Sequence, residues 1–354
     1  MKGQACKAPV ARTPGVATVL ALSARVGNDP LLTQGSTGNA SIKVGRHLWI
    51  KASGKWMADA AREDILVPLP MADVHSCIER NIDPTGPYPS ASIETAMHAV
   101  LPHRVVLHVH CVNTIAWAVR RDGPRQLQDR LEGLRWRWIP YVASGLALAQ
   151  ELEKHSEADV FVLANHGLVL GGPDANAVEC LLEQVRRRLA LPPRQTRSPD
   201  YDALERLADA NSWDAPKDNM VHSLGIDPVS RAILSGGLLY PCQAIFSNCS
   251  SPAGLFRPVR PNCVDDLWTS GPAQRPFIIV EDYGVLLSRS ASAAMRAMIL
   301  GLAQVVQRVG ASAPVRYLAE DEAPNPFGVI ARRYRELSSQ NYGGSSEAAD
   351  SAHS

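Results

Sequence analysis

The feature that most constrains the fold is the short apolar run from Val105 to His110, which reads VVLHVH and follows Pro102. Mostly β-branched runs of this length favour a buried strand. Other strand patterns alternate with helical periodicities through the first half of the chain, and such alternation indicates an α/β layer fold. The expected helices are 17–26, 72–80, 92–101, 144–155 and 174–191, and the expected strands are 40–44, 47–52, 104–110 and 159–164.

A change of composition after Pro192-Pro193 divides the chain. The polar stretch that follows predicts a linker over 193–215, after a first domain over 1–192. A smaller α/β domain is expected over 216–335, on the evidence of two strand patterns and one long helical pattern. These are 277–280, 284–287 and 292–309. The small polar residues of 336–354 predict a disordered tail.

Composition excludes several classes of protein. The 354 residues include 36 basic and 35 acidic side chains, which argues against a nucleic-acid or anionic-membrane binder. No apolar run approaches the ~18 residues of a membrane helix. The basic residues before Val16 imitate a short signal peptide, but the helical spacing of Val16, Leu20 and Ala24 favours an amphipathic helix. Seven scattered cysteines without a C-x-x-C pair fit reduced thiols in the cytoplasm.

Three histidines form the pattern with the most chemical content. His108 and His110 lie two residues apart in the predicted strand, so their imidazoles face the same way. His166, in Asn165-His166-Gly167, follows the next predicted strand. The His-x-His pair alone more often has a structural role. Three imidazoles together predict a catalytic zinc centre, because they leave at least one coordination position open.

A carboxylate and two glycine-bearing loops accompany the histidines. Glu94 stands at the start of a predicted helix, where it is either a general base beside a metal or a charge favoured by the helix dipole. The loops 37–41 (TGNAS) and 52–55 (ASGK) adjoin strands. They can present N–H groups and hydroxyls to an anion, or simply form turns. Neither loop matches a nucleotide-binding motif.

Five segments in order carry a specific resemblance. They read TGNAS, KASGKW, PSASIETAMHAVLPH, VLHVHC and LANHGLVLGG. Together they resemble the class II aldolase/adducin family over about Thr18 to Leu189, most closely the aldolase half of bifunctional rhamnulose-phosphate aldolase/dehydrogenases. The resemblance implies an αβα layered domain with a central, mainly antiparallel sheet. No short-chain dehydrogenase pattern follows, so we expect no nicotinamide chemistry.

The resemblance also implies a function and a site. The function is a zinc-dependent (or other divalent-metal) aldolase that makes or cleaves a C–C bond in a short sugar, sugar phosphate or sugar acid through a metal-stabilised enediolate. It is expected to be a cytoplasmic homo-oligomer, commonly a tetramer, without nucleic-acid or membrane partners. Epimerisation or decarboxylation at the same metal, and a non-catalytic adducin-like interaction domain, are the alternatives. The implied metal ligands are His108, His110 and His166, the acid/base is Glu94, and the anion pocket is Gly38, Asn39, Ser53, Gly54 and Ser92.

Two departures from the family pattern concern the substrate. The usual Ser-Ser-Glu is Ser92-Ile93-Glu94 here, so one expected hydroxyl of the anion pocket is missing. The tyrosine that protonates the aldehyde in some members has no clear counterpart, and Tyr141 is the nearest candidate. Both departures bear on the phosphorylated substrate more than on the metal.

Overall fold

The larger of the two sheets formed by the described residues has seven strands in the order β3-β2-β1-β4-β7-β6-β5. The computed structural model describes residues 14–210, 213–247, 251–264 and 275–340. The strands are β1 Asn39–Val44, β2 His47–Lys51, β3 Leu66–Pro70, β4 Val105–Val109, β5 Trp136–Ile139, β6 Val160–Leu163 and β7 Gly167–Gly172. All neighbours are antiparallel except β5 and β6. The predicted α/β fold with a mainly antiparallel central sheet is confirmed.

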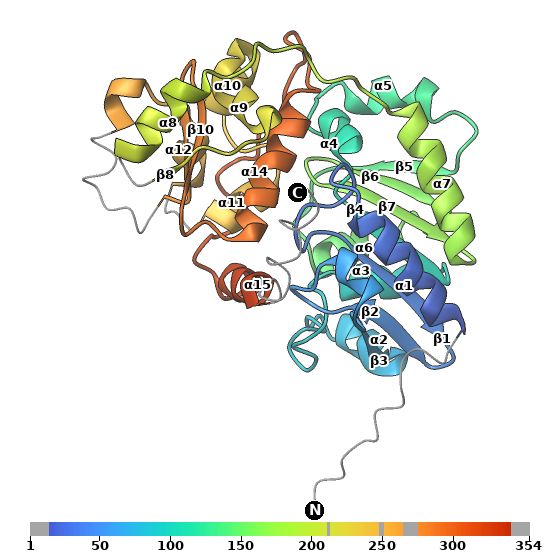
Figure 1. The fold of residues 1–354 in the computed structure, drawn as a ribbon. Coiled ribbons are helices and arrows are strands. Elements are labelled where there is room, and N and C mark those ends of the chain that lie inside the picture. The colour runs from blue at the N-terminus through green and yellow to red at the C-terminus, as the bar shows by residue number, and fades with distance from the viewer. Residues whose placement is uncertain (1–13, 211–212, 248–250, 265–274, 341–354) are drawn as a thin grey trace, which may run out of the picture.

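Helices cover both faces of this sheet (Figure 1). Val105, Leu107 and Val109 of β4 share a core with the helices α1 and α7, whereas Val106 shares a core with α3 and α6. Residues two apart in a strand face the same side, so His108 lies on the α3 and α6 side. The helices of this region are α1 Pro14–Gly27, η2 Met57–Ala61, α2 Met71–Glu79, α3 Thr95–Val100, α4 Val112–Ala118, α5 Gly123–Arg130, α6 Leu146–Glu153 and α7 Ala175–Arg188.

The C-terminal region, residues 201–340, contains a three-stranded antiparallel sheet in the order β8-β10-β9. Its strands are β8 Trp213–Asp214, β9 Phe277–Val280 and β10 Gly284–Ser288. Its helices are α8 Tyr201–Ala210, α9 Asn219–Ile226, α10 Pro228–Ser235, α11 Pro241–Ser247, α12 Pro252–Phe256, η3 Pro261–Cys263, α14 Ala293–Val306 and α15 Val329–Gln340. One hydrophobic core includes residues of both α4 and α14, so this region packs directly on the first. No helix of the described residues is long and apolar enough to cross a bilayer.

Two predicted boundaries are wrong in the structure. The expected linker 193–215 contains α8 and β8, because Leu204, Ala208 and Trp213 are buried against Ile278 and Leu286. The expected disordered tail 336–354 overlaps α15, which continues to residue 340 and buries Ser338. The rest of that tail, residues 341–354, lies outside the described residues.

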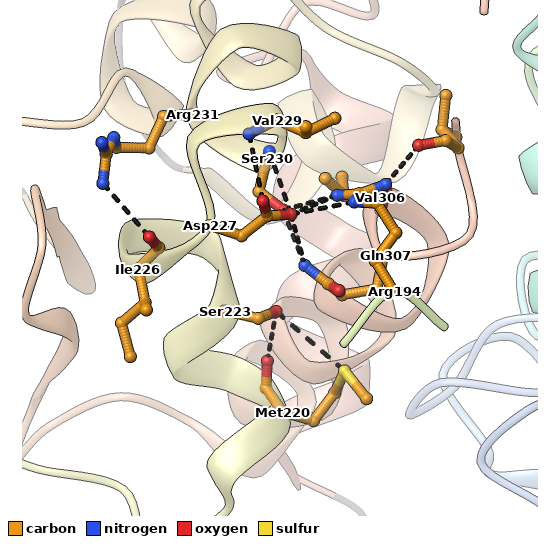
Figure 2. A network of polar contacts seen from close by, with 11 residues as sticks. Arg194, Met220, Ser223, Ile226, Asp227, Val229, Ser230, Arg231, Val306 and Gln307 are labelled. Carbon is orange, nitrogen blue, oxygen red and sulfur yellow. Dashed lines mark hydrogen bonds and ion pairs between the residues drawn. The ribbon is translucent and has the colours of Figure 1, made fainter. Parts of the chain in front are cut away.

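A buried carboxylate fastens the segment after α7 to the C-terminal region (Figure 2). Asp227 joins α9 to α10 and accepts hydrogen bonds from the Val229 N–H (3.1 Å) and the Ser230 hydroxyl (2.8 Å). The same carboxylate accepts from the Gln307 amide (2.9 Å) and from the Arg194 guanidinium. The Arg194 side chain also donates to the Val306 carbonyl (2.9 Å). Asp227 therefore links three segments that are distant in the sequence.

Candidate metal centre

The structure brings the three predicted histidines together at one end of the large sheet. His108 belongs to β4, His110 follows that strand, and His166 stands in the turn between β6 and β7. Each offers a ring nitrogen, and these nitrogens lie within 4.8 Å of one another. All three side chains are buried. The grouping has the size and ligand chemistry of a three-histidine metal site.

Local backbone geometry explains how His166 reaches the cluster. Asn165 has a φ of 52°, in the left-handed region that asparagine tolerates better than most residues. Its amide donates to the carbonyls of Leu239 (2.7 Å) and Arg316 (2.9 Å). Gly167 packs so closely that a Cβ there would lie 2.6 Å from the Val109 carbonyl oxygen. The sequence Asn-His-Gly therefore makes a tight turn that holds His166 beside β4.

The hydrogen bonding and burial of the three imidazole rings are suited to metal binding. His108 Nδ1 lies 3.1 Å from the Leu168 carbonyl oxygen, to which it donates. This leaves the lone pair on His108 Nε2, which is buried and makes no hydrogen bond within the described part of the chain. Burial lowers the pKa of His110, and it lowers the pKa of His166 to about 4. Three buried rings, with the His108 Nε2 free of a hydrogen bond among the described residues, fit a divalent ion.

Glu94 faces the histidines rather than the helix that follows it. Its carboxylate oxygens lie 3.4 Å from His108 Nε2 and 3.3 Å from His166 Nε2. The Asn39 amide donates to Oε2 (2.8 Å) and the Ser144 hydroxyl to Oε1 (3.3 Å). Burial raises the pKa of Glu94, but His108 and His166, when they carry positive charge, and the Asn39 amide lower it below its usual value. The carboxylate is ionised at neutral pH and makes no capping hydrogen bond to α3.

Four of the five predicted anion-pocket residues line the same cavity as Glu94, and the fifth does not. The four are Gly38, Asn39, Ser53 and Ser92. Asn39 pairs directly with His108 in the β1–β4 register, which places its amide beside the cluster. Gly54 lies under α15 instead, where a Cβ would come within 2.3 Å of the Leu337 Cβ. Gly54 is therefore a packing position in this structure.

Sequence reasoning missed several residues that line the cavity, including Lys51, Cys242 and Tyr334. Lys51 is 2% exposed, and its ammonium donates to the carbonyls of Ser36 (2.8 Å) and Lys55 (2.6 Å). Burial lowers the pKa of Lys51 to about 7. Cys242 of α11 has its Sγ 3.5 Å from His110 Nδ1, and Tyr334 comes from α15. Only Lys51 had a local signal, because it begins the segment KASGKW.

Two other residues near the cavity, Tyr141 and His98, have different surroundings. Tyr141 donates its hydroxyl to the Glu322 carbonyl (2.9 Å) and lines a neighbouring cleft rather than the metal cavity. His98 is fully buried, with Nδ1 2.7 Å from the Ser41 hydroxyl and Nε2 hydrogen-bonded to Asn39 Oδ1. The His98 ring therefore reaches the Glu94 carboxylate through Asn39.

Comparisons with known proteins point to one family. Residues 18–190 match the family described as "Class II Aldolase and Adducin N-terminal domain". A relative from Bacillus subtilis (strain 168), "Uncharacterized oxidoreductase YuxG", is 28% identical over 184 residues, which are 45% of this chain and 26% of the relative. The chain thus matches about a quarter of the length of that curated relative.

Solved structures also resemble part of the chain. The N-terminal class II aldolase domain of a conserved protein from Thermoplasma acidophilum has 22% identity and a TM-score of 0.44, covering 53% of this chain and 97% of its own. The L-fuculose-1-phosphate aldolase from Thermus thermophilus has 19% identity and a TM-score of 0.36, covering 49% and 92%.

Proposed function

Because residues 18–190 belong to the class II aldolase and adducin N-terminal domain family, we propose that this chain is a metal-dependent lyase of the aldolase type. It would form or cleave a carbon–carbon bond in a short sugar, sugar phosphate or sugar acid. One observation carries the proposal. The buried Glu94 carboxylate lies 3.3 and 3.4 Å from the Nε2 atoms of His166 and His108.

The chemistry divides between the imidazoles and the carboxylate. A divalent ion such as Zn²⁺, held by His108, His110 and His166, would act as a Lewis acid toward a substrate carbonyl. Glu94 is the base, because an ionised, buried carboxylate can accept a proton from the carbon next to that carbonyl. The Asn39 amide already holds Oε2, at 2.8 Å. We therefore assign the proton to Oε1, whose contact with Ser144 is longer, at 3.3 Å.

The cavity also supplies groups for an anionic or hydroxylated end of the donor half of the substrate. Lys51 and the hydroxyls of Ser53 and Ser92 line it. The ammonium uses two of its three N–H groups on Ser36 and Lys55, which leaves one for a ligand. Gly54 has no part in the proposal because Leu337 covers it.

Epimerisation and decarboxylation would use the same metal and base, so they are alternatives at the same site. A non-catalytic role has less support, because burying a carboxylate is costly unless a partner compensates for it. The homo-oligomeric state and the cytoplasmic location expected from the sequence belong to the proposal as well.

Metal analysis tests the ligand set. We expect purified protein to hold about one divalent ion per chain. His108→Ala and His166→Ala should each lose it, while His47→Ala, which changes an exposed histidine of β2, should keep it. Full occupancy in the His108→Ala/His166→Ala double variant would contradict the ligand assignment.

Proton exchange tests Glu94. The probes are dihydroxyacetone and dihydroxyacetone phosphate, whose α-protons are followed by NMR in deuterated water. Glu94→Gln should exchange about 100-fold more slowly than the wild type, since an amide cannot accept the proton. Metal should remain bound, and Glu179→Gln, which changes a surface partner of Arg25, should exchange at the wild-type rate. Wild-type exchange in metal-loaded Glu94→Gln would remove Glu94 from the mechanism.

A further inference from the structure

A segment of the C-terminal region, residues 239–243, approaches the histidine cluster. It reads Leu-Tyr-Pro-Cys-Gln and includes the start of α11. Leu239, Tyr240 and Cys242 are buried, and they share a hydrophobic core with Val112 of α4. Because α4 begins two residues after His110, the segment packs on the part of the chain that directly follows this histidine.

The first contact of the segment with the cluster holds the turn that presents His166. The Leu239 carbonyl accepts a hydrogen bond (2.7 Å) from the side-chain amide of Asn165, the residue before His166. Arg316, also of the C-terminal region, donates to Oδ1 of Asn165 (2.8 Å). Asn165 is fully buried and has a φ of 52°, so these bonds hold a backbone that few residue types adopt.

The second contact involves the ring of His110. Cys242 Sγ lies 3.5 Å from His110 Nδ1, and both side chains are buried. An imidazole that binds a metal through one nitrogen carries its proton on the other, and that N–H needs an acceptor. Sulfur can accept a hydrogen bond, although weakly. The thiol at Nδ1 therefore leaves Nε2 of His110 for an ion.

An independent observation indicates that a ligand belongs at this cluster. His108 Nε2 is buried and has no hydrogen-bond partner among the described residues. The rings of His108 and His110 lie with their centroids 5.0 Å apart. An ion bound by His110 Nε2 would satisfy the free nitrogen of His108 as well.

Hydrogen bonds within the segment keep its two contact points in place. The Oε1 atom of Gln243 accepts from the N–H groups of Leu239 (2.6 Å) and Tyr240 (3.3 Å), and Gln243 is fully buried. Pro241, between the two contacts, has a restricted φ. The Leu239 carbonyl and the Cys242 thiol are thus presented to the cluster by one short, braced turn.

We propose that segment 239–243 positions the metal ligands, and that Cys242 is the positioning residue that holds His110 with its Nε2 toward the ion. The C-terminal region then controls the metal affinity of a centre whose ligands all come from the first 190 residues. The inference rests on the metal site of the function proposed above. Coupling between two sites is reciprocal, so a bound ion should also stabilise the segment.

Metal affinity in Cys242 variants tests the positioning role. Chelator competition for Zn²⁺ should show about tenfold weaker binding in Cys242→Ala. Cys242→Val fills the space but cannot accept a hydrogen bond, so it should weaken binding as well. Cys242→Ser should bind close to the wild-type value, because its hydroxyl can accept from Nδ1. The matched control is Cys111→Ala, which changes a buried cysteine directly after His110 that packs in the core beside α1 and α7, and it should keep wild-type affinity.

Two further readouts distinguish positioning from other roles. With Co²⁺ in the site, the wild type should lack the near-ultraviolet absorption of a thiolate–cobalt bond. Such a band, absent in Cys242→Ala, would make Cys242 itself a ligand and overturn the positioning role. Amides of residues 242–247 should exchange with deuterated water more slowly, by up to about tenfold, when metal is bound. Equal exchange with and without metal would contradict the coupling.

The outcomes separate this inference from the function proposed above. Wild-type affinity in folded Cys242→Ala and Cys242→Val would overturn the role of Cys242 and leave the metal site standing. If Cys242→Ser bound as weakly as Cys242→Ala, the hydrogen bond to Nδ1 would be refuted. A wild-type protein that binds neither Zn²⁺ nor Co²⁺ would instead overturn the metal site, and this inference with it.

Discussion

We expect His98 to hold the proposed base, Glu94, in position. The hydrogen bonds of His98 show how it does so. The Asn39 amide NH₂ donates to Oε2 of Glu94 (2.8 Å), and a carboxylate can only accept. The other atom of the amide, Oδ1, is therefore an acceptor facing His98. His98 must carry its proton on Nε2, and its Nδ1 accepts from the Ser41 hydroxyl at 2.7 Å. The ionised carboxylate thus determines the tautomer of a histidine that it does not touch.

The change His98→Ala removes both hydrogen bonds of the imidazole ring, to Ser41 and to Asn39. The Ser41 hydroxyl and Asn39 Oδ1 would each lose a partner in a buried space, at about 1–3 kcal/mol per group. We expect the free energy of unfolding to fall by about 2–6 kcal/mol from these two losses. An Asn39 amide that is free to rotate no longer fixes Glu94, and a misplaced catalytic group can cost about 100-fold in rate.

The change His98→Gln separates positioning from a purely structural role. A glutamine Nε2 can donate to Asn39 Oδ1 as the imidazole does, so donor exchange should stay within a few-fold of the wild type. Burial lowers the pKa of His98 to about 3, so the ring stays neutral near pH 7. The pH profile of exchange should therefore keep its shape in His98→Gln.

The assay is α-proton exchange per folded, metal-loaded chain, with urea unfolding alongside. An exchange rate in His98→Ala equal to that of the wild type would refute the positioning role, whatever the loss of stability. A rate in His98→Gln as low as in His98→Ala would refute the tautomer argument.

Three further predictions concern the rest of the molecule. Arg194 lowers the pKa of Asp227 against the effect of burial, so the stabilisation is present at neutral pH and is lost as the pH falls through the lowered pKa. Asp227→Asn should accordingly lower the free energy of unfolding by about 3 kcal/mol at neutral pH and by much less in acid. If urea unfolding gave the same difference between variant and wild type at both pH values, the prediction would be contradicted. Cys242→Ala should weaken metal binding by up to about tenfold in a chelator competition, because its Sγ lies 3.5 Å from His110 Nδ1, whereas exposed Cys180→Ala should have no effect. Light scattering should show a homo-oligomer, and a monomer at micromolar concentration would argue against the tetramer implied by the family.

The parts that sequence reasoning predicted best depend on local rules. The alternation in Val105 to His110 places both histidines on one face whatever the rest of the chain does. The Asn-His-Gly sequence signals a tight turn through residues that tolerate a positive φ, and Asn165 has one. The helix predicted over 92–101 begins later, at Thr95, because Ser92 accepts turn hydrogen bonds from the N–H groups of Glu94 and Thr95.

The features of the site that the sequence could not predict come from packing between residues that are far apart in the chain. Cys242 and Tyr334 lie more than 70 residues beyond His166, in helices whose own patterns carry no metal or catalytic motif. Gly54 looked like an anion-binding glycine because of the local sequence Ala-Ser-Gly-Lys. Only the docking of Leu337 shows that this glycine provides room for a helix. Such contacts depend on which apolar surfaces meet, and no short window of sequence records that.

Several contacts join the C-terminal region to the candidate metal site. Ser338 of α15 lies 2.6 Å from the hydroxyl of Ser36, beside the carbonyl that Lys51 holds. Cys242 of α11 contacts His110, and Arg316 donates to Oδ1 of Asn165. The residues we assign to metal and base all come from the first 190 residues, whereas residues 321–331 of the second region line the cleft next to the metal cavity. Substitutions in 321–328 would therefore change the neighbouring cleft without altering the residues that we assign to the metal and the base.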